Sequence, residues 1–416
     1  MKVYPLLVLW IFGISDVFGQ TITLQTLEAS FLSNHYALIA SKYEIDIAEA
    51  ERIQEKLWDN PSLQLSEVNL WKTSQVEQLS TLFGTYGRNQ QFSLELEQLI
   101  ETAGKRRKRV AIKELNKQSA IYAYEELLQE LLKTLRQTYF SLARSQEEKE
   151  QLDTGVELFD QLKAQYQRQS ERSNVSKADF YRVQTELNGL RKEKVELENH
   201  QTDLLQTLRV LSQRSDLLIE QIDFTAFQQV SKPLPIQLQE LARLQNIGLK
   251  RQQNEIQLVE KELQLEKAKR IPDLTFQAKY DRGGNIMADF VGIGVSLDLP
   301  VFNTNKGGIR AAKMVSARES VEYAALCSEL DVAVGSLQQQ ILRLERALRE
   351  WKVDNTSDQR SLMDAYKKHL LDQQITLLEF IDFTQAHRDS HRAYLELVET
   401  YQNTFESLKH LVGQDL

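Results

Sequence analysis

The sequence has little cysteine and little proline, and both scarcities narrow the possible folds. Cys327 is the only cysteine among 416 residues, so no intrachain disulfide can form, and no cysteine near the start could accept a lipid. The six prolines lie at expected breaks in regular structure, and none occurs between Asn89 and Lys232. Such a long segment without proline permits very long helices.

Three further absences limit the classes of function. The formal net charge of −8 gives no general basic footprint for nucleic acid. Beyond the first residues, no segment approaches the roughly 20 apolar residues of a transmembrane helix, so any membrane insertion must come from strands. The sequence also has no phosphate-binding G-x-x-x-x-G-K loop, no nucleophile elbow and no metal-hydrolase helix. An enzyme is therefore the least supported class.

The first 19 residues resemble a secretory leader in composition. They contain Lys2, an apolar run from Leu6 to Ile14, and a possible cleavage site after Gly19. The alternative is a transmembrane anchor, for which this apolar run is too short. An exported, acidic chain without disulfides favours the envelope of a Gram-negative bacterium.

The chain contains one design twice, in which a pair of alternating strands precedes a heptad-patterned helical hairpin. Ser93 to Leu96 overlays Ser296 to Leu299 at an offset of 203 residues, which also puts Gly104 on Gly307, and the helices repeat at an offset of 200. We expect a signal peptide over 1–19, a first repeat over 20–232 and a second repeat over 233–416. The expected strands cover 61–72 and 91–100 in the first repeat, and 272–282 and 289–300 in the second.

Heptad spacing runs through both hairpins. In the first repeat the apolar seam begins at Phe180 and continues through positions 183, 187, 190, 194, 197, 201, 204, 208 and 211, and Phe380 begins the matching seam of the second repeat. Sustained 3.5-residue spacing predicts antiparallel coiled-coil packing. A helix from near Lys105 to near Gln169 would be roughly 100 Å long, which spans a compartment rather than a domain. Cys327 and Met363 are interpreted as core residues of these helices.

The expected strands have one apolar face and one small or polar face. Along 272–282, for example, Leu274 and Phe276 alternate with polar residues, at roughly the length of a tilted bilayer-spanning strand. The alternation changes phase within 61–72, which predicts a β-bulge near Glu67. A half-buried sheet of a soluble protein would give the same pattern. In the membrane alternative, four strands cannot close alone, so oligomerisation must remove the open edges.

Together these segments resemble the TolC-like outer-membrane efflux family. The resemblance rests on NPSL after the first helix, ETAGKRRKR after the second strand, SKADFYRVQTEL at a helical turn, PDL before the third strand and LPVFNTNKGGIRAAK after the fourth. Its ETAGKR and LPVFNTNKG segments are most similar to the heavy-metal exporter branch. The resemblance implies a mostly α fold with membrane β structure. Three subunits would form a 12-stranded outer-membrane β-barrel continued by a periplasmic α-helical tunnel.

The function implied by the family is a passive export channel in a tripartite efflux system, with no catalytic residue and no cofactor. Its partners are a periplasmic membrane-fusion adaptor and an inner-membrane pump of the resistance-nodulation-division type. The adaptor meets the hairpin turns, which correspond here to Asn174, Val175 and Ser176, and to Gln374, Ile375 and Thr376. The alternative is a periplasmic coiled-coil adaptor or structural protein, which would have one hairpin flanked by β-rich domains.

The resemblance also indicates where the tunnel would be constricted. In the family, acidic residues narrow the closed tunnel just past the second turn, and the matching stretch here is Leu378 to Asp382. Glu379 and Asp382 are the gate candidates, because three copies around a threefold axis would form cation-attracting rings. The alternative is two solvated helix carboxylates. The family's turn usually carries a glycine, whereas this chain has Asp372-Gln373-Gln374.

Two further groups of residues have alternative interpretations. The basic run Lys105, Arg106, Arg107, Lys108 and Arg109 begins a helix, where the helix dipole disfavours cations. We expect phospholipid headgroups to offset this charge, and carboxylates such as Glu101 are the alternative. His387 and His391 have a helical spacing that can chelate a metal, but no third ligand accompanies them in a motif, so we predict no metal site.

Overall fold

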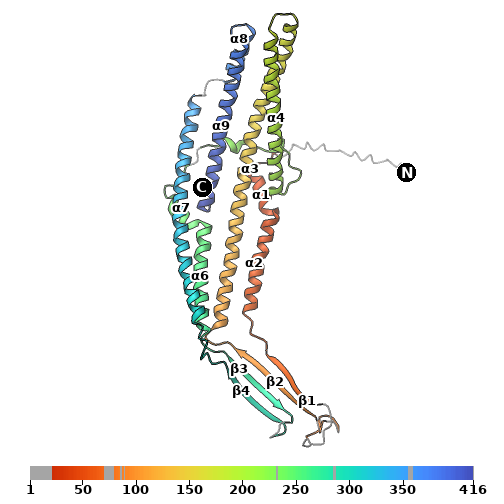
Figure 1. Ribbon diagram of the computed structural model, residues 1–416, viewed down its shortest axis with the longest axis vertical. Helices are drawn as coiled ribbons and strands as arrows, with labels where there is room; N and C mark the ends of the chain where they lie inside the picture. Colours follow the sequence, from red (N-terminus) through yellow and green to blue (C-terminus); the bar gives the residue numbers. More distant parts are fainter. Residues whose placement is uncertain are drawn as a thin grey trace, which may run out of the picture. The chain divides into compact units, whose positions relative to one another are not determined.

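The computed structural model describes residues 21–69, 79–84, 87–88, 90–230, 233–283, 287–354 and 359–415. The predicted signal peptide over 1–19 lies outside the described residues. Long helices and one antiparallel sheet make up the described chain (Figure 1). Among the helices described, none has the length and apolar character needed to cross a bilayer.

The elements follow the predicted order. The four strands are β1 (Ser62–Asn69), β2 (Gln91–Ile100), β3 (Leu274–Asp281) and β4 (Phe290–Leu297). The first-repeat helices are α1 (Leu24–Asn34), α2 (Tyr36–Glu55), α3 (Lys105–Glu171) and α4 (Lys177–Ser212). The second-repeat helices are α5 (Leu238–Gln245), α6 (Ile247–Ala268), α7 (Lys306–Asp354), α8 (Gln359–Leu371) and α9 (Leu377–Val412). Strands occur at all four predicted positions, although residues 70–72 of the first lie outside the described residues. The helix predicted from near Lys105 to near Gln169 is α3, which has 67 residues.

The chain forms two compact units that differ from the two sequence repeats. The hairpin unit comprises Met1–Tyr36, Leu128–Ala242 and Ala333–Leu416, and the sheet unit comprises Ala37–Leu127 and Arg243–Val332. Each unit takes residues from both repeats. Long helices such as α3 therefore pass from one unit into the other, and the expected repeat boundary near 232 does not divide the chain into compact bodies.

In the hairpin unit, an apolar core joins the two helical hairpins. Phe159 of α3, Leu187 of α4 and Phe380 of α9 are at most 1% exposed and belong to one cluster that also includes Leu370 of α8. No residue of the α4 seam that begins at Phe180 is exposed, which confirms the predicted seam. Burying each large apolar side chain contributes about 1.5–3 kcal/mol, so this stripe is a main source of hairpin stability.

The repeat is preserved in the backbone of the hairpin turns. Helices α4 and α9 both have 36 residues, at an offset of 200. Ser173 and Gln373 both adopt φ 57°, and the helices that follow begin at Ser176 and Thr376 as N-caps. The offset of 203 is not kept in the structure, because β2 ends at Ile100 and β4 at Leu297. In addition, Gly104 precedes α3 with φ 66°, whereas Gly307 lies inside α7. The predicted equivalence of these two glycines is wrong.

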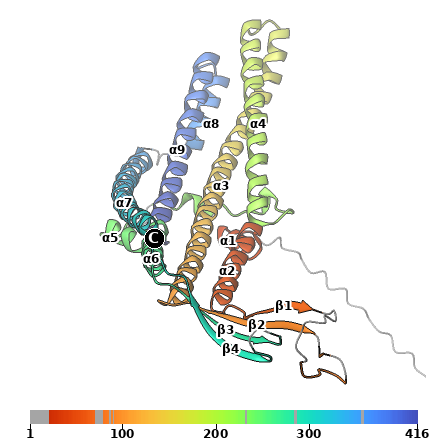
Figure 2. The same ribbon diagram turned by 60° about the horizontal axis from the view of Figure 1, so that its bottom comes forward.

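In the sheet unit, both repeats contribute to one antiparallel sheet. The strands lie side by side in the order β1-β2-β3-β4 (Figure 2). The central pair joins β2 of the first repeat to β3 of the second, so β1 and β4 are the sheet edges. Glu67 has φ 54° at a register shift between Ser66 and Asn69, which confirms the predicted bulge. Cys327, interpreted as a core residue of α7, is half-buried.

Candidate functional site

The sheet has one face made almost entirely of apolar side chains. Because side chains alternate along strands and the register aligns them across strands, Leu65, Leu94, Tyr280 and Val291 form one row. The next row on this face is Leu63, Leu96, Ala278 and Ile293. Most of these side chains are exposed, with Ile293 at 91% and Val291 at 72%, and Tyr280 is half-buried.

The opposite face of the sheet is polar. Glu95 lies opposite Lys279, and Gln277 donates a hydrogen bond of 2.8 Å to Glu97. On β4 this face carries glycine and serine, which leaves room beside the longer side chains of β3. A sheet that presents an apolar face outward and a polar face on the other side fits an apolar environment on one side and water on the other.

The gate candidates lie in the first turns of α9 and both are exposed. Glu379 closes a capping box: its carboxylate accepts hydrogen bonds from the Thr376 backbone N–H at 2.7 Å and from the Thr376 hydroxyl at 2.8 Å. These two hydrogen bonds lower the pKa of Glu379 below its usual range. Asp382 follows three residues later on α9, one helical turn further on. Glu379 therefore has a local structural role in addition to any role in conduction.

The predicted docking residues occupy two turns with the same backbone design. In the first turn, the backbone N–H of Asn174 bonds to Gln169, and the Ser176 hydroxyl caps α4 by accepting from the Asp179 N–H at 3.1 Å. The second turn repeats both contacts at an offset of 200, from Gln374 to His369 and from Glu379 to Thr376. Val175 and Ile375 are half-buried, and the other four docking candidates are exposed.

The basic run at the start of α3 divides into paired and outward cations. Lys105 is 7% exposed and lies 2.8 Å from Asp273, and Arg109 bonds to both Glu101 and Glu55. For these two residues, carboxylates of the same chain offset the positive charge, which was the alternative to lipid headgroups. Arg106 instead stacks on Trp58, with its guanidinium carbon 3.8 Å from the ring centroid, and Arg107 is exposed.

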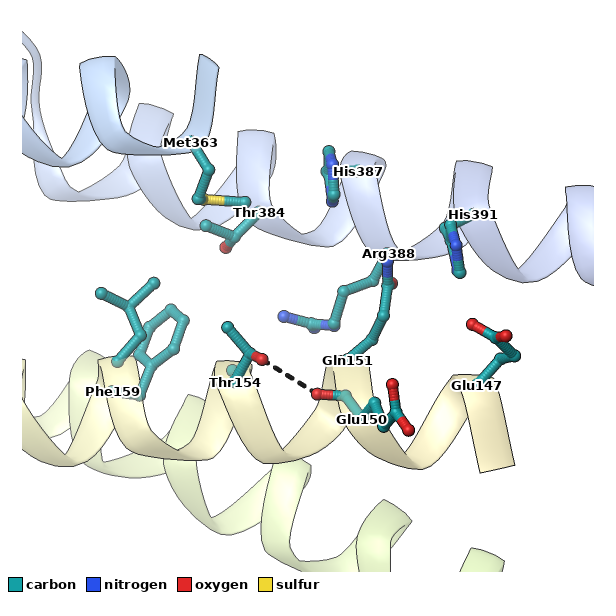
Figure 3. Close-up of a pocket in the computed structure, with 12 residues that line it drawn as sticks. Glu147, Glu150, Gln151, Thr154, Phe159, Met363, Thr384, His387, Arg388 and His391 are labelled. Carbon is teal, nitrogen blue, oxygen red and sulfur yellow. Dashed lines mark hydrogen bonds between the residues drawn. The ribbon is translucent and has the colours of Figure 1, made fainter. Parts of the chain in front are cut away.

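The two histidines line a cleft of about 490 Å³ between α3 and α9 in the hairpin unit. Figure 3 shows His387 and His391 opposite Gln151 and Glu147 of α3, with Met363 at one end. Nε2 of His387 and Nδ1 of His391 are buried without a hydrogen-bond partner. Burial lowers the pKa of both imidazoles, and a neighbouring cation or imidazole lowers it further.

No group of three or more metal-ligating side chains occurs among the residues that the structure describes. Met363, interpreted as a core residue, is half-buried at this cleft.

Sequence reasoning missed a buried ion cluster in the hairpin unit. Arg136 of α3 is 8% exposed and pairs with Glu28 at 2.6 Å, Glu406 at 2.9 Å and Asp415 at 2.7 Å. In the sequence, the one indication of this cluster was that Arg136 lies among apolar seam residues. Its partners are too far away in sequence to be recognised. The cluster ties α1, α3, α9 and the residues after α9 together.

Comparison with known proteins gives a family match over part of the chain. Residues 29–212 match the model of the outer membrane efflux protein family. No curated protein matches the chain. The open-state MtrE outer membrane channel of Neisseria gonorrhoeae has a TM-score of 0.73 at 14% identity, covering 97% of this chain and 93% of that chain.

Two further solved structures have the same fold. The CmeC outer membrane channel of Campylobacter jejuni has a TM-score of 0.70 at 14% identity, covering 94% of this chain and 85% of that one. The outer membrane protein VceC of Vibrio cholerae has a TM-score of 0.69 at 14% identity, covering 94% and 96%. Residues 29–212 thus match the outer membrane efflux protein family, and nearly the whole chain shares the fold of these solved channels.

Proposed function

We propose that this chain is the subunit of a trimeric outer-membrane channel that passively conducts substrates from the periplasm to the exterior. The observation that carries the proposal is the sheet with an exposed apolar face, a polar opposite face and two open edges. An apolar patch of this size on a monomer requires an apolar environment. Lipid provides it, and the energy for export comes from the partner pump.

Trimerisation would remove the open edges of the sheet. Within the chain, β2 of one repeat already pairs with β3 of the other, and β1 and β4 remain as edges. In a bilayer, unpaired backbone groups cost several kcal/mol each, so edge strands must pair. Pairing β4 of one subunit with β1 of the next closes a barrel of 12 strands from three copies, with Glu95, Glu97 and Lys279 on its water-filled side.

The long helices would continue this channel as a periplasmic tunnel. In this arrangement the two hairpin turns form the tunnel's periplasmic end and meet a membrane-fusion adaptor, which links the channel to a resistance-nodulation-division pump. Glu379 and Asp382 follow the second turn directly, so three copies would place rings of carboxylates near this end. Such rings would attract cations and narrow the closed tunnel.

The experiment that tests this function combines mass with membrane insertion. The purified protein in detergent should run near three times the mass of the processed chain, whose full sequence has a mass of 48.2 kDa. It should also stay with the outer membrane after carbonate washing, whereas a periplasmic adaptor or structural protein would be extracted. A monodisperse monomer that keeps its strand signal contradicts the proposal.

Two matched substitutions test which face of the sheet meets lipid. Ile293→Arg places a charge on the apolar face, at a cost of about 2–4 kcal/mol near the bilayer midplane. Gln277→Arg places the same charge on the polar face beside Glu97. We expect the first variant to lose most of the membrane-inserted trimer and the second to keep it. Equal effects of the two substitutions would argue against a lipid-facing sheet.

A further inference from the structure

Four connecting segments of the sheet unit meet where the strands join the helices. They are residues 56–61 between α2 and β1, 101–104 between β2 and α3, 269–273 between α6 and β3, and 298–305 between β4 and α7 (Figure 1). The antiparallel register places Ile100, Leu274 and Leu297 side by side, so these segments leave the same end of the sheet. Thr102 donates its backbone N–H to Asp273 at 2.8 Å, and the side chain of Gln98 bonds to the Asp59 carbonyl at 2.9 Å. The four segments therefore form one layer next to the sheet.

This layer exposes large apolar side chains. Phe302 is 100% exposed, Val301 and Leu299 are 70% and 69% exposed, and Trp58 and Leu57 are 58% and 57% exposed. They lie in the segments between the strands and the helices. Aromatic side chains in such a position are typical of the boundary between lipid tails and headgroups.

The same layer carries an excess of exposed cations, in contrast to the net charge of −8 for the whole chain. The exposed basic residues in and beside these segments are Lys56, Arg107, Lys269, Arg270, Lys306 and Arg310. Its exposed acidic residues are Asp59 and Asp298, while Glu101 and Asp273 are paired with Arg109 and Lys105. Among the exposed cations, Lys269 is paired with Glu266. Positive charge is thus concentrated in the layer between the strands and the helices, although the protein as a whole is acidic.

Within the basic run, the contacts separate an inward pair from an outward pair, and the fifth cation, Lys108, donates to the Ala103 carbonyl. Lys105 and Arg109 are bound to carboxylates. Arg106 donates to the Lys56 carbonyl at 3.0 Å and stacks on Trp58, which leaves other N–H groups of its guanidinium available to a further acceptor. Arg107 is exposed beside it. Arginine binds phosphate oxygens well because its planar fork of donors matches their geometry.

We propose that this collar, composed of Trp58, Arg106, Arg107, Arg270 and Phe302, binds the phosphates of anionic phospholipids at the periplasmic face of the membrane. The aromatic side chains enter the boundary of the lipid tails, and the guanidinium groups contact the headgroup phosphates. The inference rests on the proposed function, because it requires the apolar sheet to be inserted in a bilayer. In this proposal the outward arginines bind lipid headgroups, whereas Lys105 and Arg109 form ion pairs that stabilise the fold.

The test reconstitutes the purified trimer into vesicles of phosphatidylcholine alone or of phosphatidylcholine with phosphatidylglycerol. Since each Lys or Arg near an anionic surface contributes about 1 kcal/mol, Arg106→Gln with Arg107→Gln should reduce the preference for phosphatidylglycerol vesicles roughly tenfold or more. Insertion into phosphatidylcholine should not change. The matched control removes two exposed cations of the hairpin unit, Arg182→Gln with Lys192→Gln, and should keep the preference.

Two outcomes would overturn the collar. If the double variant keeps the full phosphatidylglycerol preference, the outward arginines do not bind headgroups. If it loses insertion equally in both kinds of vesicle, these arginines support folding rather than lipid binding. Trp58→Ala gives an independent readout, because losing an apolar anchor should weaken insertion in both kinds of vesicle. Failure of the unmodified protein to insert at all would instead contradict the proposed channel.

Discussion

At the residue scale, the hairpin turns depend on two residues in the left-handed backbone region. Ser173 and Gln373 both have φ 57°, a conformation that costs residues with a side chain roughly 1–2 kcal/mol. The second turn of the family that this sequence resembles usually carries a glycine, whereas this chain has none there. The backbone reaches the same turn without it, with Gln374 bonding to the His369 carbonyl at 2.8 Å.

Replacing the strained glutamine should stabilise the turn. Gln373→Gly relieves the left-handed strain, partly offset by the greater freedom of glycine in the unfolded chain, so we expect a gain of up to about 1 kcal/mol. The measurement is the midpoint of chemical or thermal unfolding of the helical signal. Asp372→Gly, at a neighbouring position without positive φ, is the control and should leave stability unchanged or lower it.

A second residue-scale prediction concerns the buried cluster around Arg136. Removing its charge leaves Glu406, which is 3% exposed, with Lys409 at 2.8 Å as its remaining partner among the described residues. Breaking a buried ion pair typically costs about 3–5 kcal/mol, and we expect Arg136→Ala to lose about 3 kcal/mol of unfolding free energy. Lys192→Ala breaks an exposed pair and should cost less than about 1 kcal/mol. Equal losses would mean that the cluster adds no stability.

At the element scale, the cleft between α3 and α9 makes their packing sensitive to pH. The titratable or charged groups around His387 and His391 are Glu147 and Glu150 of α3, Arg388 of α9, and Glu186 of α4, which pairs with Arg388 at 2.8 Å. Burial favours the neutral imidazoles in the folded state. Below about pH 6.5, these histidines bind protons more readily in the unfolded chain than in the folded protein. The free energy of unfolding therefore falls as the pH decreases.

This acid sensitivity should disappear with the two imidazoles. Between pH 7 and pH 5.5, we expect the unfolding temperature to fall less in the His387→Gln with His391→Gln variant than in the unmodified protein. Glu148 has the opposite effect, because burial raises its pKa and the folded state gains stability as that carboxyl binds a proton. Glu148→Gln should therefore make the acid-induced fall larger. An identical fall in all three proteins would refute the linkage.

Elements with a regular period could be predicted from sequence, and contacts between distant segments could not. The bulge at Glu67 could be predicted because side chains alternate with a period of two residues along a strand, and one extra residue changes the phase of this pattern. The α4 seam was visible for the same reason at a period of 3.5. By contrast, the partners of Arg136 and Lys105 come from segments more than 100 residues away, and nothing in their local sequence marks them.

At the scale of the whole molecule, the proposed trimer determines what the acidic pair on α9 can do. The capping contacts hold the Glu379 carboxylate near the start of α9, and Asp382 is exposed next to it. Three copies would bring six carboxylates together, and their mutual repulsion favours bound cations. Divalent cations such as Ca²⁺ should therefore lower conductance in planar bilayers.

Glu379→Gln with Asp382→Asn should remove most of this divalent block and leave the trimer intact. Glutamine can still complete the capping box with Thr376, so the substitution removes charge without removing the helix cap. Each single variant shows how the block divides between the two positions. Unchanged block in the double variant would mean that the constriction lies elsewhere.

The two turns share a backbone but not their side chains, and this difference has a consequence for assembly. Around the mouth of the proposed tunnel, turns with Asn174-Val175-Ser176 would alternate with turns carrying Gln374-Ile375-Thr376. If a ring of identical partner subunits docks with one subunit on each turn, alternate subunits would contact two chemically different surfaces. Its protomers would bind with two affinities, and the weaker set would be the first to detach when the complex is titrated apart.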